Sequence, residues 1–219
     1  MSIKDNIEAV KGKIYDSAIR SNRNPEDILL IGVSKNISPP RILEALEAGI
    51  QHFGENRVQE FLDKYEKVDK KVKWHLIGSL QTNKVKYIID KVELIHSLDR
   101  IKLAQEIEKI AARIDKQIPV LVQVNISGET TKSGIKPDDV IDFVESVTQY
   151  PHIRVKGLMT IGPLTEDEQL IRTCFRRMKK LFDEICKRDI PHVEMQYLSM
   201  GMTNDFEIAI EEGSNMVRI

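Results

Sequence analysis

A lysine at the end of a short apolar segment is the first residue that could do covalent chemistry. Lys35 closes the segment ILLIGVSK, residues 28–35. Burial at such a position favours the neutral amine, and a neutral amine is a competent nucleophile toward a carbonyl group. The alternative is a lysine on the rim that points into water. Position alone favours that alternative, because perturbed groups indicate functional sites only in a statistical sense.

The segment LSMGMTNDFEIAIEEG, residues 198–213, could bind an anion. Gly201 permits a tight turn, and Thr203 or Asn204 could cap the helix that follows it. Free N–H groups at a helix N-terminus favour a phosphate, and the hydroxyls of Ser199 and Thr203 would add donors. A capped helix start that holds no ligand is the alternative interpretation.

Arg218 is the third residue of interest, because it lies beside apolar Met216 and Val217 near the last residue. An arginine inside an apolar segment is rarely left without a partner, so we expect either a structural ion pair or a ligand contact. The sequence leaves both possibilities open.

Several weaker candidates accompany these three. Glu55 and Asn56 end a second apolar segment and could orient a ligand or a neighbouring lysine. His75 is interpreted as a hydrogen-bonded histidine of the protein interior. The five histidines and two cysteines show no spacing that is typical of metal ligands, so no metal site is predicted.

Eight short apolar segments could position these residues, and a helical pattern separates each from the next. Strands that alternate with helices predict parallel pairing by right-handed crossovers, and eight units of this length predict a closed (β/α)₈ (TIM) barrel over one domain, residues 1–219. An amphipathic helix over 2–21 precedes the first strand, and no eighth helix follows the last strand. An open doubly wound sheet is the alternative fold. In a barrel the functional residues lie at the C-terminal ends of the strands. The predicted strands are 28–35, 52–56, 73–78, 93–99, 118–125, 154–162, 193–201 and 215–219.

Composition excludes several classes of protein. The chain has 33 Lys and Arg against 34 Asp and Glu, so the formal net charge of -1 gives no general attraction to nucleic acid or to anionic membranes. No apolar run reaches the ~20 residues that a membrane-spanning helix needs. The charged N-terminus does not look like a signal peptide, and the two separated cysteines suggest a reducing compartment. We therefore expect a cytoplasmic protein, and without a long apolar stripe we expect a monomer.

Six segments that run nearly end to end resemble the pyridoxal phosphate homeostasis protein family, the YggS or PROSC type. Each segment alone is only moderately specific, whereas the set is highly specific. The resemblance implies the fold of the N-terminal barrel domain of alanine racemase. The segments are LIGVSKN (30–36), HFGENRVQE (52–60), WHLIGSLQTNK (74–84), VNISGETTKSGI (124–135), GLMTIGP (157–163) and LSMGMTNDFEIAIEEGSNMVRI (198–219).

The resemblance also implies a cofactor, pyridoxal 5′-phosphate (PLP), and a role for individual residues. Lys35 would hold PLP as an internal aldimine, a Schiff base. Ser199 and Thr203, around Gly201, would contact the phosphate. Arg218 would lie near the pyridine nitrogen, where a guanidinium does not readily yield a proton. The family continues after Ile219 with a Gly-Thr pair that would help to hold the phosphate, so a chain that ends at Ile219 is expected to bind PLP more weakly. Neighbours of the ring would be Asn56, Ile77, Met159 and Met200.

The function that the resemblance implies is non-catalytic, so no catalytic residue is predicted. The chain would carry PLP, keep the free aldehyde low, and deliver the cofactor to apo PLP-dependent enzymes. One alternative is a PLP-dependent amino-acid racemase, which needs a base on each face of the substrate. Lys35 could serve one face, but no tyrosine falls in a motif that would supply the second base. The other alternative is a Schiff-base aldolase that uses Lys35 without PLP.

Overall fold

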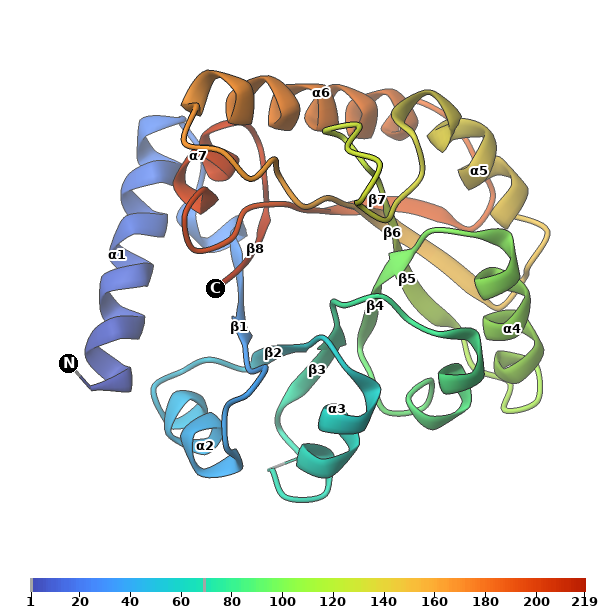
Figure 1. Cartoon of the computed structure of the whole chain (residues 1–219), viewed down its shortest axis with the longest axis horizontal. Coiled ribbons are helices and arrows are strands. Elements are labelled where there is room, and N and C mark those ends of the chain that lie inside the picture. The colour runs from blue at the N-terminus through green and yellow to red at the C-terminus, as the bar shows by residue number, and fades with distance from the viewer. Residues whose placement is uncertain (1, 69) are drawn as a thin grey trace.

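Eight parallel strands form a closed barrel in the computed structural model, which describes residues 2–68 and 70–219. Each strand pairs with the next along the chain, and β8 pairs with β1 through Leu29 and Met216 (Figure 1). The predicted TIM barrel is therefore confirmed and the open sheet is excluded. The strands are β1 (Leu29–Val33), β2 (His52–Glu55), β3 (Lys73–Leu76), β4 (Leu94–Leu98), β5 (Ile118–Gln123), β6 (Ile153–Met159), β7 (Val193–Ser199) and β8 (Met216–Arg218).

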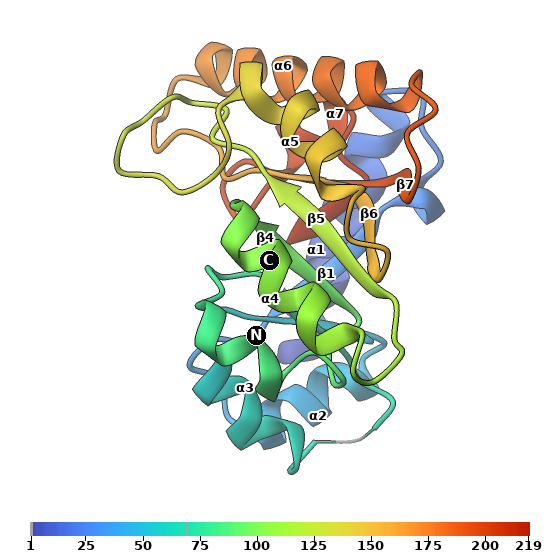
Figure 2. The same cartoon turned by 90° about the vertical axis from the view of Figure 1, so that its right-hand side faces the viewer.

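Helices surround the strands in chain order, as Figures 1 and 2 show. The yellow-green loop between β5 and α5 extends beyond the barrel wall in Figure 2. Residues 25–27, 82–87 and 137–139 form short 3₁₀ helices. The α-helices of the described residues are α1 (Ile3–Arg20), α2 (Pro39–Glu47), α3 (Val58–Tyr65), α4 (Ile101–Ala111), α5 (Val140–Val147), α6 (Glu168–Cys186) and α7 (Phe206–Glu211).

The connection between β3 and β4 differs from the predicted helix. Thr82–Tyr87 forms only a 3₁₀ helix, and turns follow it. The residue before it, Gln81, makes no side-chain capping bond, and β-branched residues are frequent through position 89, which disfavours a longer α-helix. The buried residues Val85, Ile88 and Ile89 still cover the barrel, so the segment performs the packing role of the expected helix.

Two apolar layers lie on the two faces of the strands, which explains why the strand segments are apolar throughout. The larger layer fills the space between the barrel and the helices. The smaller layer fills the interior of the barrel and comprises Ile31, Leu94, Leu121, Met159 and Met216. Because successive side chains of a strand point to opposite faces, membership of a layer tells which residues face the interior.

The helix α1 covers the seam between β8 and β1. Ile14 and Ala18 of α1 pack against Phe206 and Ile210 of α7 and against Val217. Two ion pairs between α1 and α7 add to this contact, Lys13 to Glu207 at 3.0 Å and Arg20 to Glu211 at 2.9 Å. The first helix therefore takes the place that a helix after β8 would fill (Figure 1).

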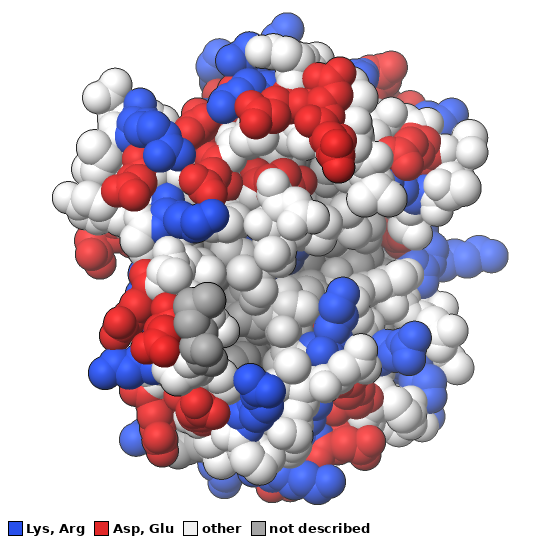
Figure 3. Space-filling view, turned by 60° about the vertical axis from the view of Figure 1, so that its left-hand side comes forward, with Lys and Arg blue, Asp and Glu red and all other residues white. Residues whose placement is uncertain are grey.

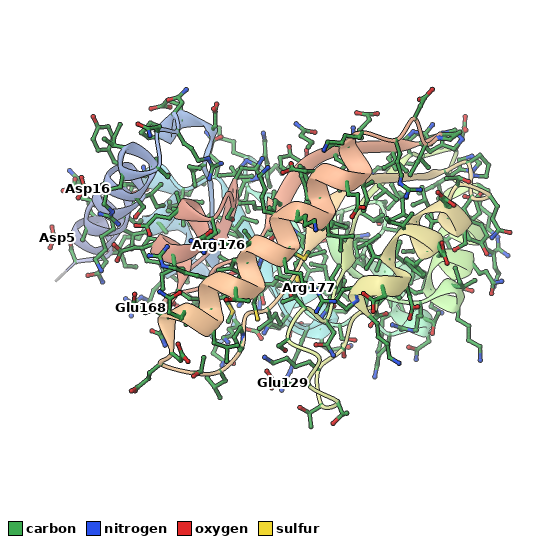
Figure 4. All side chains as sticks on the ribbon, turned by 90° about the horizontal axis from the view of Figure 1, so that it is seen from above. Asp5, Asp16, Glu129, Glu168, Arg176 and Arg177 are labelled. Atoms are coloured by element: carbon green, nitrogen blue, oxygen red, sulfur yellow. The ribbon has the colours of Figure 1, made fainter. Side chains whose placement is uncertain are left out.

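The basic residues of α6 form ion pairs with neighbouring elements, as expected for a solvated face. Arg176 and Arg177, both labelled in Figure 4, bond Glu212 at 2.7 Å and Asp138 at 3.2 Å. Local carboxylates thus balance the local positive charge. Among the described residues no helix is both long and apolar enough to span a bilayer.

Candidate functional site

Lys35 lies in the turn after β1, two residues beyond the end of the strand at Val33. Its side chain is exposed and makes no hydrogen bond or ion pair with the described residues. The structure thus has the rim lysine that its position in the sequence favoured, and β1 ends two residues earlier than the predicted strand 28–35. The amine is accessible at the C-terminal rim of the barrel.

A buried cluster below the Lys35 turn fixes the backbone of that turn. Ser34 donates its hydroxyl to Glu55 Oε1 at 2.6 Å. Lys64 of α3 donates to the same carboxylate oxygen at 2.8 Å, to Glu60 at 2.7 Å and to the Ser34 carbonyl at 2.5 Å. We call Ser34, Glu55, Glu60 and Lys64 the rim clamp. Glu55 does orient a lysine, as the sequence suggested, but that lysine is Lys64.

The rim clamp also holds the residue after Lys35. The Asn36 backbone N–H donates to Glu60, and Asn36 has a left-handed φ of 60°, a conformation that asparagine adopts more readily than most residues. Burial raises the pKa of Glu55, while the hydrogen bonds from Lys64 and Ser34 oppose the shift by favouring the charged form. Hydrogen bonds thus fix the backbone on both sides of Lys35, whose own side chain is exposed.

Arg218 lies inside the barrel and is 4% exposed. Its guanidinium donates to Ser199 Oγ at 2.6 Å and to the Thr160 carbonyl at 2.8 Å. No carboxylate is within hydrogen-bonding distance in the described part of the chain, and the buried Asp205 acts on Arg218 only over a longer range. Burial lowers the pKa of Arg218 to about 10, so the side chain stays charged at neutral pH.

Ser199 faces the interior of the barrel, where the Arg218 guanidinium and His96 Nδ1 lie within 2.6 and 3.3 Å of its hydroxyl. The predicted phosphate contact is thus already held by two side chains. Since Ser199 points inward, its neighbour Met200 points outward into the layer between barrel and helices. Met200 therefore does not join Met159, which lies in the interior layer as a ring neighbour would.

The segment after β7 makes its turn as predicted but caps its helix differently. Gly201 has φ +96° and no room for a Cβ, which would approach Ala209 to 2.6 Å. The α-helix begins at Phe206 with Asp205 before it, whereas Thr203 and Asn204 are exposed. The prediction that either residue caps the helix is wrong, because Asp205 accepts from the Met202 N–H at 2.6 Å and closes the turn itself.

A cavity of about 280 Å³ opens at the C-terminal ends of β3 and β5. Ile77 and Gly78 form one wall, and Asn56 lies behind Gly78, whose absent Cβ would come within 2.3 Å of the Asn56 carbonyl. The loop after β5 forms another wall, and Lys132 ties that loop to Gly162 at 2.9 Å. Glu129 of the same loop projects away from the barrel in Figure 4.

A second hollow, of about 310 Å³, lies between α1, α2 and the ends of β1 and β8. Its walls are mainly apolar and include Ile7, Ile37 and Ile219, with Ser34 of the rim clamp at one edge. Figure 3, which brings the α1 side of the molecule forward, shows an uncharged hollow between charged patches. The rim turn therefore lies beside apolar surface on its α1 side.

Sequence reasoning missed three residues that complete this site. Lys64 reads as an ordinary helix lysine, yet it is 5% exposed, and only its spacing of four from Glu60 could have suggested an ion pair. His96 was noticed only for its lack of metal-ligand spacing, and Asp205 looked like a surface residue. No group of three or more His, Cys, Asp or Glu among the described residues could hold a metal ion.

The sequence matches known protein families over nearly its whole length. Residues 34–219 match the model of the alanine racemase N-terminal domain. A pyridoxal phosphate homeostasis protein of Aquifex aeolicus is 44% identical over 100% of this chain and 96% of its own length. The protein with the same name from Escherichia coli is 36% identical over 99% of this chain and 93% of its own length.

Solved structures agree with this match. A protein described as unknown from Bifidobacterium adolescentis has a TM-score of 0.95 at 34% identity, over 99% of this chain and 92% of its own. PipY of Synechococcus elongatus, solved with PLP bound, has a TM-score of 0.80 at 31% identity, over 94% and 96%. Alanine racemase of Clostridium difficile, at 14% identity and a TM-score of 0.70, shares the fold over 94% of this chain and 56% of its own.

Proposed function

The chain belongs to the pyridoxal phosphate homeostasis protein family, and we propose that it carries PLP on the amine of Lys35. Its function is to bind PLP in PLP homeostasis. The observation that carries the proposal is the rim clamp, which fixes the backbone on both sides of an exposed lysine at the C-terminal mouth of the barrel. When bound, PLP supplies a reactive aldehyde that condenses reversibly with a primary amine.

The residues around the mouth fit the chemistry of PLP. Arg218 offers a buried donor group whose charge no carboxylate in contact neutralises, and a donor that keeps its proton suits an unprotonated pyridine nitrogen. Gln123 lines the cavity, and its buried Oε1 has no partner among the described residues, which fits a polar ligand that approaches it. Met159 and Ile77 supply apolar surface for a ring.

We assign the remaining residues of the cofactor site as follows. Thr203 is exposed after β7 and its hydroxyl is available to a phosphate, while Gly201 lets the chain turn there. Ser199 supports Arg218 and is also a candidate phosphate contact. Asn56 lies behind Gly78 at the cavity, and Met200 contributes from the outer layer by fixing the end of β7.

Storage and delivery are favoured over racemisation. A racemase needs a second base opposite Lys35. Tyr197 lies closest in sequence to the site, but it lines the cavity at the N-terminal end of the barrel together with His52, the opposite end from Lys35. A carrier that holds its cargo on an exposed lysine can release it to apo PLP-dependent enzymes. We expect a cytoplasmic monomer to serve this role.

Borohydride reduction followed by peptide mapping tests the proposal. The purified protein incubated with PLP should gain one pyridoxyl mass on the peptide that contains Lys35. Lys35→Ala should remove this adduct and leave the free energy of unfolding nearly unchanged, since the side chain is exposed. Lys102→Ala, an equally exposed lysine of α4, is the matched control and should keep the adduct. An adduct on another lysine would reject the assignment to Lys35, and the absence of any adduct would favour a PLP-free aldolase.

A further inference from the structure

A chain of polar side chains runs through the interior of the barrel from Arg218 to the opposite end. The links are Arg218 Nη1 to Ser199 Oγ at 2.6 Å, Ser199 Oγ to His96 Nδ1 at 3.3 Å, His96 Nε2 to His75 Nδ1 at 3.0 Å, and His75 Nε2 to His52 Nδ1 at 2.8 Å. His96 and Ser199 are 0% exposed and His75 is 2% exposed. We call His52, His75 and His96 the histidine column.

The two ends of the chain lie in different surroundings. Arg218 is beside the C-terminal mouth, near the residues assigned to PLP. His52 is half-buried and lines a cavity of about 370 Å³ at the N-terminal end, together with Lys73, Glu93 and Lys156. The histidine column therefore connects the cofactor end of the barrel to a water-accessible opening at the other end.

The hydrogen-bonding capacity of Ser199 gives the chain one direction. A guanidinium has only donors, so Ser199 Oγ must accept from Arg218. The Ser199 O–H then needs an acceptor, and His96 Nδ1 is the only one that contacts it within the described residues. If His96 Nδ1 carried a proton instead, the buried Ser199 O–H would remain without a partner, which is unfavourable for a buried donor.

The same logic determines the proton on each ring. Since His96 Nδ1 accepts, a neutral His96 carries its proton on Nε2 and donates to His75 Nδ1. His75 then donates from Nε2 to His52 Nδ1, and His52 turns its own Nε2–H toward the N-terminal cavity. All three rings are therefore neutral Nε2–H tautomers, and every hydrogen bond points away from Arg218.

We propose that the histidine column is a set of positioning residues that holds Arg218 in place for PLP through this one-directional hydrogen-bond chain. The role toward PLP rests on the proposed function, whereas the direction of the chain does not. Ser199 is the junction, because it both accepts from Arg218 and donates to the column. A change at His52, at the far end, is thereby transmitted to the guanidinium.

The charges that face the column keep it neutral. Burial first, then the repulsion that a protonated His75 would exert and the charge of Arg218, lower the pKa of His96. Burial first and then Lys73 lower the pKa of His52. Glu93 opposes the shift at His52, and Asp205 stabilises the charge of Arg218. A protonated His52 would present Nδ1–H to the Nε2–H of His75, so acid breaks the chain first at this end.

Nitrogen NMR of the histidine rings in the PLP-free protein tests the direction of the chain. The wild type should show three neutral Nε2–H rings at pH 8. Ser199→Ala removes the hydroxyl that selects the direction, so His96 should populate both tautomers. A wild-type protein with Nδ1–H at His75 or His96 would overturn the proposal, whether or not PLP binds.

Two substitutions at His52 test whether the column positions Arg218. His52→Asn keeps an acceptor near the place of Nδ1, whereas His52→Leu removes it, and the site is half-buried so both should fold. His52→Leu should speed hydrogen exchange of the Arg218 guanidinium and weaken PLP binding by about two- to tenfold, the range expected for one lost hydrogen bond. His52→Asn should restore both. Equal exchange rates in all three proteins would reject the positioning role, and a failure to bind PLP in the wild type would reject only the proposed function.

Discussion

Two buried cations near the same end of the barrel have opposite surroundings. Lys64 bonds two carboxylates, Glu55 at 2.8 Å and Glu60 at 2.7 Å. Arg218 bonds a hydroxyl and a carbonyl, and its nearest carboxylate influence, from Asp205, is indirect. Carboxylates in direct contact neutralise the charge of Lys64, whereas Arg218 donates to a neutral hydroxyl and a neutral carbonyl.

The difference separates a structural role from a binding role. The carboxylates that contact Lys64 already balance its charge, so Lys64 does not attract an anionic ligand. Its role is to fix the Lys35 turn. Arg218 keeps both its charge and unused N–H groups, since a guanidinium has five donors and two acceptors are in contact. The neutral histidine column beside it supports the side chain without cancelling its charge.

Acid should lower the free energy of unfolding more than any of the substitutions below, because it protonates the histidine column beside Arg218. Burial, then the repulsion that a protonated His52 would exert and the charge of Lys73, lower the pKa of His75 from 6.5 to about 3. The unfolded chain binds this proton below pH 6.5 and the folded chain does not until about pH 3, so the free energy of unfolding should fall by roughly 5 kcal/mol across that window. Chemical denaturation as a function of pH measures the loss.

A substitution of His75 isolates its share of the acid effect. Glu55 and Asp205, whose pKa values burial raises, act in the opposite sense and stabilise the fold as the pH falls. Because His75→Asn removes the group with the lowered pKa, the free energy of unfolding should depend less on pH between 6 and 4, by up to about 1.4 kcal/mol per pH unit. An unchanged slope would show that His75 is not neutral in the folded protein.

Lys64→Met should have the next largest effect, because it removes the cation from between two carboxylates. Glu55 is 0% exposed and would keep only the Ser34 donor, so the free energy of unfolding should fall by about 3–5 kcal/mol. The double variant Lys64→Met with Glu55→Leu should recover much of this loss, since it removes both buried charges. A single-variant loss below about 1 kcal/mol would mean that the rim clamp is not a buried ion pair in solution.

Arg218→Met should lower the free energy of unfolding less than the changes above, and it should weaken PLP binding. It loses two hydrogen bonds to neutral acceptors but also removes a buried charge, so we expect a loss of only about 1–2 kcal/mol on denaturation. PLP affinity, measured by absorbance titration, should fall about tenfold or more because a charged donor is lost. A stability loss as large as that of Lys64→Met would contradict the contrast between the two cations.

The fold was largely predictable because apolar strand segments and helical segments alternate along the whole chain. The start of α2 was also predictable, since Ser38 followed by two prolines leads to a helix that begins at Pro39. The ends of the strands were not. The predicted strand 28–35 included Ser34 and Lys35, but β1 ends at Val33, and the Ser34 side chain bonds Glu55.

The site was harder to predict because its supporting contacts join residues distant in sequence. Ser199 and His96 are 103 positions apart, and no periodicity of either segment predicts that they meet inside the barrel. Lys64 was overlooked because a lysine on a helix usually faces water. The resemblance pointed to Lys35 and Arg218, whereas only the packing of the strands reveals what holds them.

The position of α1 over the last seam has a consequence for folding during synthesis. The helix leaves the ribosome before any strand of the barrel, yet its partner residues on α7, such as Glu207 and Glu211, are made almost two hundred residues later. Until then the part of its apolar face that packs on α7 and Val217 lacks its partners, and the barrel cannot close between β1 and β8. Contacts between such distant segments are slow to form, so we expect closure of the barrel to be the final step of folding. Nascent chains would then leave the α7-facing part of α1 uncovered until the last strand is made, a period in which a chaperone could bind it.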